Sequence, residues 1–533
     1  MVRSRGSRRV LVGILSGALG ATALGVVPAS AVSATPQQPV VKSNFLSEEW
    51  LADQDAHSMY SIAKWAGVHD VWAKRDALGR KITGAGVGIA LIDSGITPVK
   101  GLDGAGKVVN GPDLSVESQA DNLRYLDTYG HGTHMAGIIA GQDAGVEPGT
   151  VSSKSFAGVA PGAHLINMKV AGADGAVDVS QVIAAIDWVV AHRNDPGLNI
   201  RVINLSFGTD SLQDPRMDPL SHAVEAAWRA GIVVVVAAGN DGASAARLAM
   251  PAMNPYVLAV GGADTNGTDN RADDVVGDFS SRGDANRAPD LVAPGKSVVS
   301  LRDPGSYIDT EYPEGQLATD SAKRFFRGSG TSQAAAVTSG AAALLLQQRP
   351  DLTPDQVKEL LVSTAEAMPA ADPVGSGAGQ LDVEAAADAT TPAQTQSHPA
   401  SLGTGSLEQA RGTAHLTDPI NGRELTGEQD LMGNPWNAPV WAQQAATGTS
   451  WDAGTWNGGV WTGTAFDGTS WAATTWTGTA WSDVAWSAHE AGFTGRSWTG
   501  RSWTGRSWTG RSWTGRSWTG SVWSGAAWAA PAN

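Results

Sequence analysis

Four short segments of the chain carry side chains that together could hydrolyse an acyl bond. In chain order, these side chains are Asp93, His131, Asn240 and Ser332. A serine hydroxyl becomes a nucleophile when a neighbouring base takes its proton, and imidazole titrates near the pH at which such a base must work. A carboxylate can orient the imidazole, and a carboxamide can donate a hydrogen bond to an oxyanion. The four residue types therefore predict acyl transfer through a serine nucleophile.

The local sequence places these residues where such chemistry is usually found. Asp93 follows an apolar run that predicts a buried strand, and open parallel sheets place their ligands at the carboxyl ends of the strands. His131 and Ser332 each begin a predicted helix, at 131–140 and 332–348. A nucleophile at a helix N-terminus gains from the helix dipole and from free backbone N–H groups near the oxyanion.

Taken singly, each segment has a commoner explanation. Asp-Ser-Gly, Ala-Gly-Asn and Gly-Thr-Ser are usually turn or loop sequences. His131 and His134 lie one helical turn apart and could bind a metal, but no His-Glu-x-x-His pattern or carboxylate partner accompanies them. We therefore predict no metal site and expect His134 to be packed or hydrogen-bonded. All four segments in the order Asp, His, Asn, Ser are a much stronger indication than any one of them.

Composition narrows the class of protein. The chain has 533 residues, of which 42% are hydrophobic, enough for a large buried core. Its formal net charge of −15 argues against nucleic acid as a partner, because phosphate binding uses clustered lysine and arginine. The absence of cysteine excludes thiol catalysis, cysteine-bound zinc and disulfides.

Apolar runs and helical patterns alternate up to about residue 389, which predicts an α/β domain with a largely parallel sheet covered on both faces. The predicted strands lie at 84–93, 165–170, 202–205, 232–237 and 257–260, and the clearest helical pattern lies at 179–192.

The N-terminus has the pattern of an export signal. Residues 1–31 combine four arginines, an apolar stretch at 10–27 and a small-residue cleavage site at 29–31. A membrane anchor is the alternative, but the glycines and the cleavage site favour removal, so we expect no transmembrane segment in the mature chain. The pair of arginines at 8–9 leaves twin-arginine and general export both open. We expect a secreted or cell-surface protein with a short N-terminal extension at 32–60.

Two segments of biased composition follow the α/β domain. Residues 390–435 are rich in small and polar residues without a clear period, which predicts a linker. At 436–533 tryptophan recurs every five residues, and Arg-Ser-Trp-Thr-Gly repeats five times at 496–520. A period of five fits neither a helix nor a strand. This low-complexity repeat tail is either a spacer or self-packing solenoid, or an aromatic and basic surface that binds cell-wall polymer.

With these motifs, the chain resembles the subtilisin-like serine protease (subtilase) family over residues 61–389. The resemblance implies a three-layer α/β domain in which Asp93, His131 and Ser332 form a catalytic triad and Asn240 assists the oxyanion hole. It also implies protein or peptide substrates and a reaction that needs no cofactor. Family members often bind calcium in a structural role, but the sequence assigns no ligands to such a site. The alternative function is cell-surface binding or adhesion by a catalytically silent domain of this fold.

The resemblance also implies a set of substrate-binding residues. An extended peptide would pair with an edge segment that contains Ser206, Phe207 and Gly208, and one wall of the pocket before the scissile bond would contain Ala237, Ala238 and Gly239. Ala249 is expected on the pocket floor.

Three features depart from the family pattern. Gln333 stands where the family usually has methionine, and the extension at 32–60 is short for an inhibitory prodomain. Residues 302–327 carry several acids and are predicted to form a surface loop that gates the site or binds a cation.

Overall fold

The computed structural model describes residues 49–460 and the strand 492–493, apart from short gaps at 116, 119–121, 149–150, 153–154, 369–371, 394–395, 418–423 and 453. The predicted signal peptide, the extension up to residue 48 and most of the tryptophan repeats lie outside the described residues.

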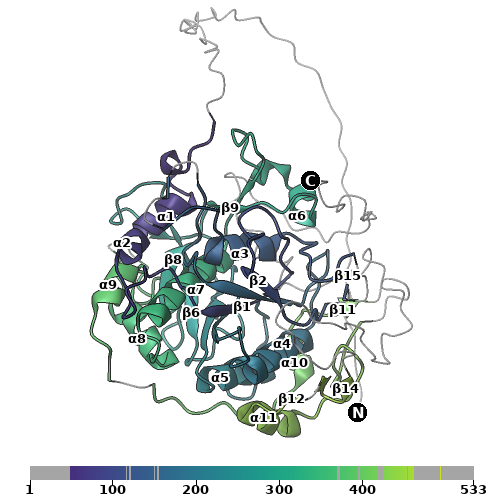
Figure 1. The fold of residues 1–533 in the computed structure, drawn as a ribbon. Helices are drawn as coiled ribbons and strands as arrows, with labels where there is room; N and C mark the ends of the chain where they lie inside the picture. The colour runs from purple at the N-terminus through teal and green to yellow at the C-terminus, as the bar shows by residue number, and fades with distance from the viewer. Residues whose placement is uncertain are drawn as a thin grey trace, which may run out of the picture. The chain divides into compact units, whose positions relative to one another are not determined.

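An eight-stranded sheet forms the centre of the domain (Figure 1). Its main path runs β2-β3-β1-β4-β5-β6-β7, and β8 also pairs with β6. All pairings are parallel except β6 with β7. The strands are β1 (Gly88–Asp93), β2 (Val108–Asn110), β3 (His164–Lys169), β4 (Ile200–Leu205), β5 (Val233–Ala237), β6 (Leu258–Asp264), β7 (Val275–Val276) and β8 (Leu291–Pro294).

The strands are apolar on both sides because helices cover both faces of the sheet. Every residue of β1 and of β5 is buried, which matches the continuous apolar runs in the sequence. On one face, α3 (His131–Ala140) packs against α7 (Thr331–Gln348), and on the other α4 (Val179–His192) packs against α5 (Pro219–Arg229) (Figure 1). The prediction of a largely parallel three-layer α/β domain is confirmed.

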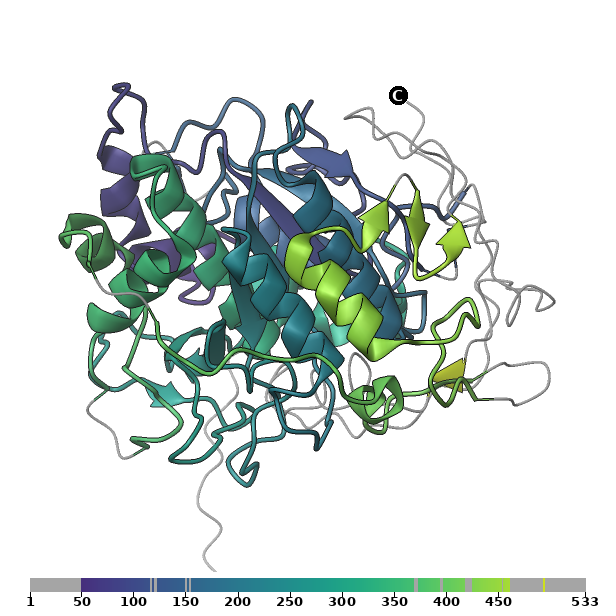
Figure 2. The same cartoon turned by 90° about the horizontal axis from the view of Figure 1, so that it is seen from below.

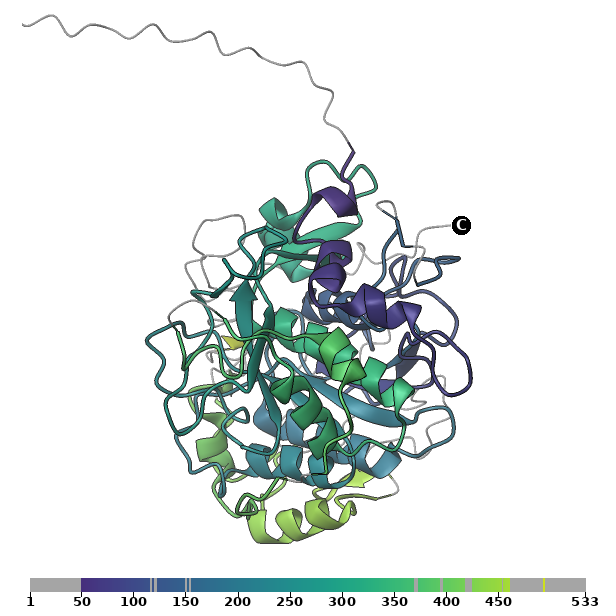
Figure 3. The same cartoon turned by 90° about the vertical axis from the view of Figure 1, so that its left-hand side faces the viewer.

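Smaller elements complete the domain near its N-terminal end. The helices η1 (Ala52–Gln54), α1 (Met59–Trp65) and α2 (Val68–Ala73) contact one another in chain order, and α2 lies against α9 (Val383–Asp388), which packs on α8 (Pro354–Ser363) (Figures 1 and 3). The ring centroids of Trp50 and Phe325 lie 4.7 Å apart in a tilted arrangement, so residues from 49 onward belong to the packed domain, earlier than the predicted boundary at 61.

The prediction of a surface loop at 302–327 is wrong. This segment contains α6 (Tyr307–Glu311), η2 (Pro313–Gly315) and β10 (Phe325–Gly328), which pairs with β9 (Val298–Leu301). Asp309 pairs with Arg302, and Asp320 accepts the backbone N–H of Phe325 at 2.9 Å. Both carboxylates are buried and hold the segment together. Among the residues that the structure describes, no group of three or more histidine and acidic side chains could hold a metal ion.

The prediction of a linker at 390–435 is also wrong where the structure describes that segment. It contains α10 (Leu407–Arg411) and β11 (Leu416–Thr417), which pairs with β15 (Gly492–Phe493). Arg411 has no exposed surface and forms an ion pair with the buried Asp178, with 2.6 Å between Nε and Oδ2. A few anchor residues thus fix a segment whose small, polar composition had suggested a flexible chain.

The first part of the tryptophan series belongs to the domain. The segment contains α11 (Ala438–Thr447), which lies against α5 (Figure 2), and a small antiparallel sheet of β12 (Trp451–Asp452), β13 (Thr455–Trp456) and β14 (Gly459–Val460). The indole N–H groups of Trp441 and Trp456 both donate to Asp187 on α4, each at 2.8 Å. The prediction of a separate tail starting at residue 436 is therefore wrong for residues 436–460.

In the described parts of the chain, no helix combines the length and apolarity that a membrane crossing needs.

Candidate active site

The predicted aspartate and histidine are in direct contact. His131 Nδ1 lies 2.8 Å from Asp93 Oδ1 and 2.9 Å from Asp93 Oδ2, and both side chains are at most 1% exposed. Asp93 ends β1 at the carboxyl edge of the sheet, and His131 is the first residue of α3. The carboxylate holds the imidazole by Nδ1, so that Nε2 is directed away from Asp93.

Asp127 fixes the turn that carries the histidine. Its carboxylate accepts the backbone N–H groups of Gly130 and Thr133, each at 2.7 Å, and the hydroxyl of Ser94 at 2.7 Å. It thereby satisfies free N–H groups at the start of α3. Burial raises the pKa of the Asp127 carboxyl, which these hydrogen bonds oppose. Our sequence analysis missed Asp127, because Asp127 lies four residues before His131, whereas a capping residue is expected directly before the helix, where Gly130 stands.

A glycine allows this helix to approach the strand closely. A Cβ atom on Gly132 would lie 2.1 Å from the carbonyl oxygen of Gly95, which no side chain tolerates. The backbone N–H of Gly132 instead donates to Ser94 Oγ at 2.9 Å. The glycine next to His131 is therefore required for the contact between Asp93 and the imidazole.

Ser332 lies at the start of the helix that packs against α3. It is the second residue of α7, and its Oγ lies 3.5 Å from the carbonyl oxygen of Ser206, just beyond the end of β4. The hydroxyl of Ser206 is 3.4 Å from the carbonyl oxygen of Ser332. Ser332 and the predicted substrate-binding segment are thus neighbours at the carboxyl edge of the sheet.

Asn240 is tied to the same helix start. Its Oδ1 accepts the backbone N–H of Thr331 at 2.8 Å and lies 3.2 Å from the Thr331 hydroxyl. Because a backbone N–H can only donate, the carboxamide atom that faces it must be the oxygen. The NH₂ group of Asn240 is therefore the end that does not face Thr331.

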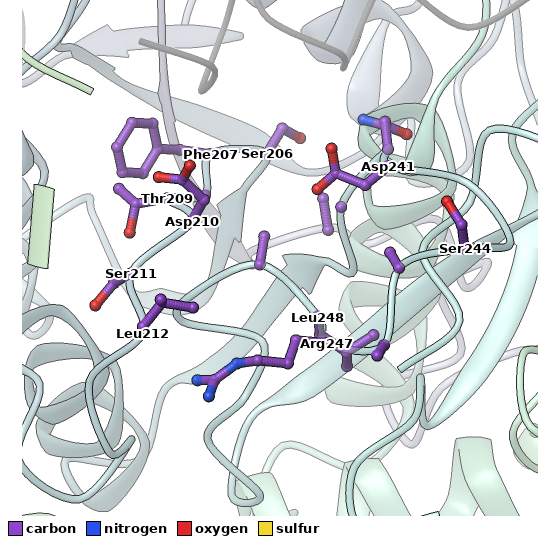
Figure 4. A pocket seen from close by; sticks show the side chains of 17 residues that line it. Ser206, Phe207, Thr209, Asp210, Ser211, Leu212, Asp241, Ser244, Arg247 and Leu248 are labelled. Carbon is purple, nitrogen blue, oxygen red and sulfur yellow. The ribbon is translucent and has the colours of Figure 1, made fainter. Parts of the chain in front are cut away.

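A cavity of about 380 Å³ lies beside these residues (Figure 4). Of the predicted substrate-binding residues, Ser206, Phe207, Gly208, Ala237 and Gly239 line it, together with Asn240 and the expected floor residue Ala249. The sequence analysis missed the rest of the lining: Thr209, Asp210, Ser211, Leu212, Asp241, Ser244, Ala245, Ala246, Arg247 and Leu248.

Ala238 does not line the cavity, in contrast to its predicted place in the wall. It is fully buried, and its carbonyl oxygen accepts the backbone N–H of Ala249 at 2.9 Å. Successive residues of an extended segment point to opposite sides, so Ala238 faces the core while Ala237 and Gly239 face the cavity.

Two further polar residues near the site have distinct surroundings. His134 is buried, its Nε2 lies 3.2 Å from the carbonyl oxygen of Phe326, and burial lowers its pKa to about 3. It is therefore neutral and packed, in agreement with the expectation from sequence. Gln333, beside Ser332, is fully buried, and neither polar atom of its side chain has a hydrogen-bond partner in the described chain.

Comparison with known proteins gives consistent results. Residues 84–405 match the model of the subtilase family. The chain is 39% identical over 312 residues to serine protease AprX of Bacillus subtilis (strain 168), a match that covers 57% of this chain and 67% of that protein. It is 33% identical over 310 residues to subtilisin DY of Bacillus licheniformis, covering 57% and 92% of the two chains. A solved cold adapted subtilisin-like serine proteinase is 27% identical, with a TM-score of 0.43 and coverage of 60% and 97%.

The parallel sheet with a buried Asp–His pair at its carboxyl edge fits a hydrolase of the α/β class. Since the family match spans more than half of the sequence, the chain belongs to the subtilase family, as its motifs predicted. It is a subtilisin-like serine endopeptidase, and its substrates are proteins or peptides.

Proposed function

We propose that Asp93, His131 and Ser332 act as the catalytic triad of this endopeptidase. His131 takes the proton of Ser332 Oγ as the oxygen attacks the scissile carbonyl carbon, and Asp93 stabilises the imidazolium. The imidazolium then protonates the leaving amine as the C–N bond breaks. Water hydrolyses the resulting ester by the same route and restores the serine. The observation that carries the proposal is the contact of His131 Nδ1 with both oxygens of Asp93, at 2.8 and 2.9 Å.

Asn240 serves as a donor to the developing oxyanion in this proposal. Its oxygen is held by Thr331, which leaves the amide N–H groups for the substrate. The start of α7 adds the free N–H groups and the positive end of a helix dipole next to Ser332. The chemistry uses protein side chains and water only, so no cofactor takes part.

The substrate backbone pairs with the edge segment at 206–208, and the side chain before the scissile bond (P1) enters the cavity of about 380 Å³. Small residues form part of the lining of this cavity, including Ala237, Gly239 and Ala249. They leave room for a medium-sized apolar or aromatic P1 side chain.

Peptide hydrolysis by the chain from residue 32 onward, compared with a Ser332→Ala variant, tests the triad. We expect the variant to lose about 10⁶ in turnover and to lose labelling by a serine-directed phosphonylating probe. Unchanged hydrolysis by the variant would contradict the proposal. Absence of both hydrolysis and labelling in the parent would instead favour the adhesion alternative.

The N-terminal sequence supports export of the enzyme, and the tryptophan and arginine repeats support attachment to cell-wall polymer. Because residues 436–460 are part of the folded domain, the attachment test compares the full chain with one that ends at residue 460. We expect only the full chain to be retained on cell-wall polymer at low salt. Equal retention of the two chains would exclude the repeats as the attachment site.

A further inference from the structure

One wall of the pocket is a loop that has no regular secondary structure of its own. Thr209, Asp210, Ser211 and Leu212 follow one another along one side of the cavity, while Asp241 and Ser244 lie on another side (Figure 4). This wall lies between the end of β4 and the start of α5. Such a loop needs contacts from elsewhere to hold one conformation.

Thr209 at the start of the loop pairs with Met250 through two backbone hydrogen bonds of 2.9 Å. Further contacts come from residues 402–413, which we call the brace. Most of the brace lies beyond residue 405, where the family match ends. Its backbone runs along the loop: the N–H of Leu402 donates to the carbonyl of Arg216 at 2.6 Å, and the N–H of Gly405 donates to the carbonyl of Met217 at 2.7 Å. The brace therefore lies directly against the loop that ends in α5.

Two wall residues are bound to the brace through their side chains. The Thr209 hydroxyl donates to the carbonyl oxygen of Ala410 at 2.8 Å. The Asp210 carboxylate accepts the backbone N–H and the hydroxyl of Thr413, one on each oxygen and each at 2.7 Å. Gly412 permits this approach, since a Cβ there would lie 2.2 Å from Asp210 Oδ1. Asp210 thus lines the pocket while Thr413 donates a hydrogen bond to each of its carboxylate oxygens.

A third contact joins the brace, through Gln213, to Arg247 in the pocket lining. The Gln213 side chain donates to the carbonyl of Ser406 at 2.8 Å and accepts the N–H of Ser406 at 2.9 Å. The carbonyl oxygen of Gln213 accepts a long hydrogen bond of 3.3 Å from Arg247, which also lines the cavity. Displacement of the brace would therefore be transmitted to Arg247 as well as to Thr209 and Asp210.

The brace itself is anchored in the body of the domain. Arg411 is buried against Asp178 at the start of α4, and it also donates to the carbonyl oxygen of Gly427 at 2.8 Å. Neither Asp178 nor Gly427 lines the pocket. The position of the brace is therefore fixed independently of the pocket wall that it contacts.

We propose that the brace is a positioning element for the P1 pocket, and that Thr413, by fixing Asp210, sets how well long P1 side chains are accepted. A P1 residue that fills the cavity touches the wall, whereas P1 alanine does not reach it. The inference rests on the proposed function, since it assumes that Ser332 cleaves peptides bound in this cavity. Thr413 contacts neither substrate nor the triad and acts only through Asp210.

Thr413→Val keeps the shape of the side chain and removes the hydroxyl that donates to Asp210. We expect kcat/KM for a peptide with P1 phenylalanine to fall by about threefold to tenfold, mainly through KM, as for loss of one hydrogen bond to a carboxylate near the surface. The value for the matching P1 alanine peptide should stay the same. Thr413→Ser keeps the hydroxyl, so its ratio of kcat/KM for the P1 phenylalanine peptide to kcat/KM for the P1 alanine peptide should equal that of the parent.

Thr447→Val is the matched control, because Thr447 is exposed and its hydroxyl donates to Gln443 within α11, away from the pocket. Labelling of Ser332 by a small phosphonylating probe is measured for every variant. An unlabelled, inactive parent would overturn the proposed function. A labelled, active Thr413→Val variant with the parent ratio of P1 phenylalanine to alanine would overturn the role of the brace alone. An equal fall for both peptides with a lower melting temperature would also overturn it, since that result indicates general destabilisation.

Discussion

The carboxamide oxygen of Asn240 accepts the backbone N–H of Thr331 at 2.8 Å, which links the loop three residues after β5 to the residue before Ser332. The contact crosses 91 positions of sequence. It fixes the carboxamide so that its donor end, and not its acceptor end, is available beside the proposed nucleophile.

Asn240→Ala should therefore lower kcat by about 10²–10³, the usual loss for one oxyanion donor. The effect should appear in kcat more than in KM, because the hydrogen bond forms fully only as the oxyanion develops. Steady-state kinetics on one peptide check the prediction. A rise in KM with unchanged kcat would show that Asn240 binds the ground state instead.

Asp93→Asn should lower kcat by about 10⁴, since an amide can donate to His131 Nδ1 and favour the wrong tautomer. The parent geometry makes this test sharp: both oxygens of Asp93 lie within 2.9 Å of that nitrogen. Thermal unfolding of the variant serves as the control, because the substitution keeps the shape of the side chain. Turnover within tenfold of the parent would exclude Asp93 as the orienting carboxylate.

The parts of the fold with strong local periodicity could be predicted from the sequence. The helix expected at 179–192 has those bounds in the structure, and the one expected at 131–140 also does. Both carry apolar residues at helical spacing and are long enough for the pattern to be clear. The strand before Asp93 could be predicted for a similar reason, because a buried parallel strand is a continuous apolar run.

The parts that depend on distant partners could not be predicted. Arg411 is fixed by Asp178, which lies 233 residues earlier, and nothing near Arg411 indicates that pairing. The tryptophans at 441 and 456 follow the same spacing of five as the later repeats, yet both are bound to Asp187 on α4. A periodic sequence shows that its members are alike, whereas tertiary contacts decide which of them are buried.

Gln333→Met should stabilise the protein by about 1–3 kcal/mol, because it removes a buried amide whose polar atoms lack partners in the described structure. The two side chains have similar volumes, so overpacking is not expected. Equilibrium unfolding in denaturant measures the change. Lower stability of the variant would show that the amide forms hydrogen bonds in solution, for example to ordered water.

Arg411→Ala should lower the free energy of unfolding by about 3–5 kcal/mol, because it leaves the carboxylate of Asp178 buried without its charge partner. A double variant, Arg411→Met with Asp178→Asn, removes both charges and keeps an acceptor at the start of α4. It should be more stable than the single variant. If the double variant were less stable than Arg411→Ala, the uncompensated charge of Asp178 would not be the cause of the stability lost in Arg411→Ala.

Asp187 should make stability depend on pH in a direction opposite to that of an ion-paired carboxylate. Burial raises its pKa from 3.8 to about 6, which the hydrogen bonds from Trp456 and Trp441 oppose. The folded chain therefore holds this proton more tightly than the unfolded chain does. The stabilisation is fully present below pH 4 and is lost as pH rises through 6. The difference in pKa corresponds to about 3 kcal/mol, as an order of magnitude.

Asp187→Asn keeps an oxygen acceptor for the two indoles and removes the titration. Relative to the parent, the variant should therefore gain about 3 kcal/mol in free energy of unfolding between pH 4 and pH 7. Denaturant unfolding of both proteins at the two pH values measures this gain, with the exposed Asp351→Asn as the control for loss of one carboxylate. A constant difference between parent and variant across the range would show that Asp187 stays ionised. In that case the two tryptophans would be held by a buried carboxylate, and Asp187→Asn should weaken their packing at both pH values.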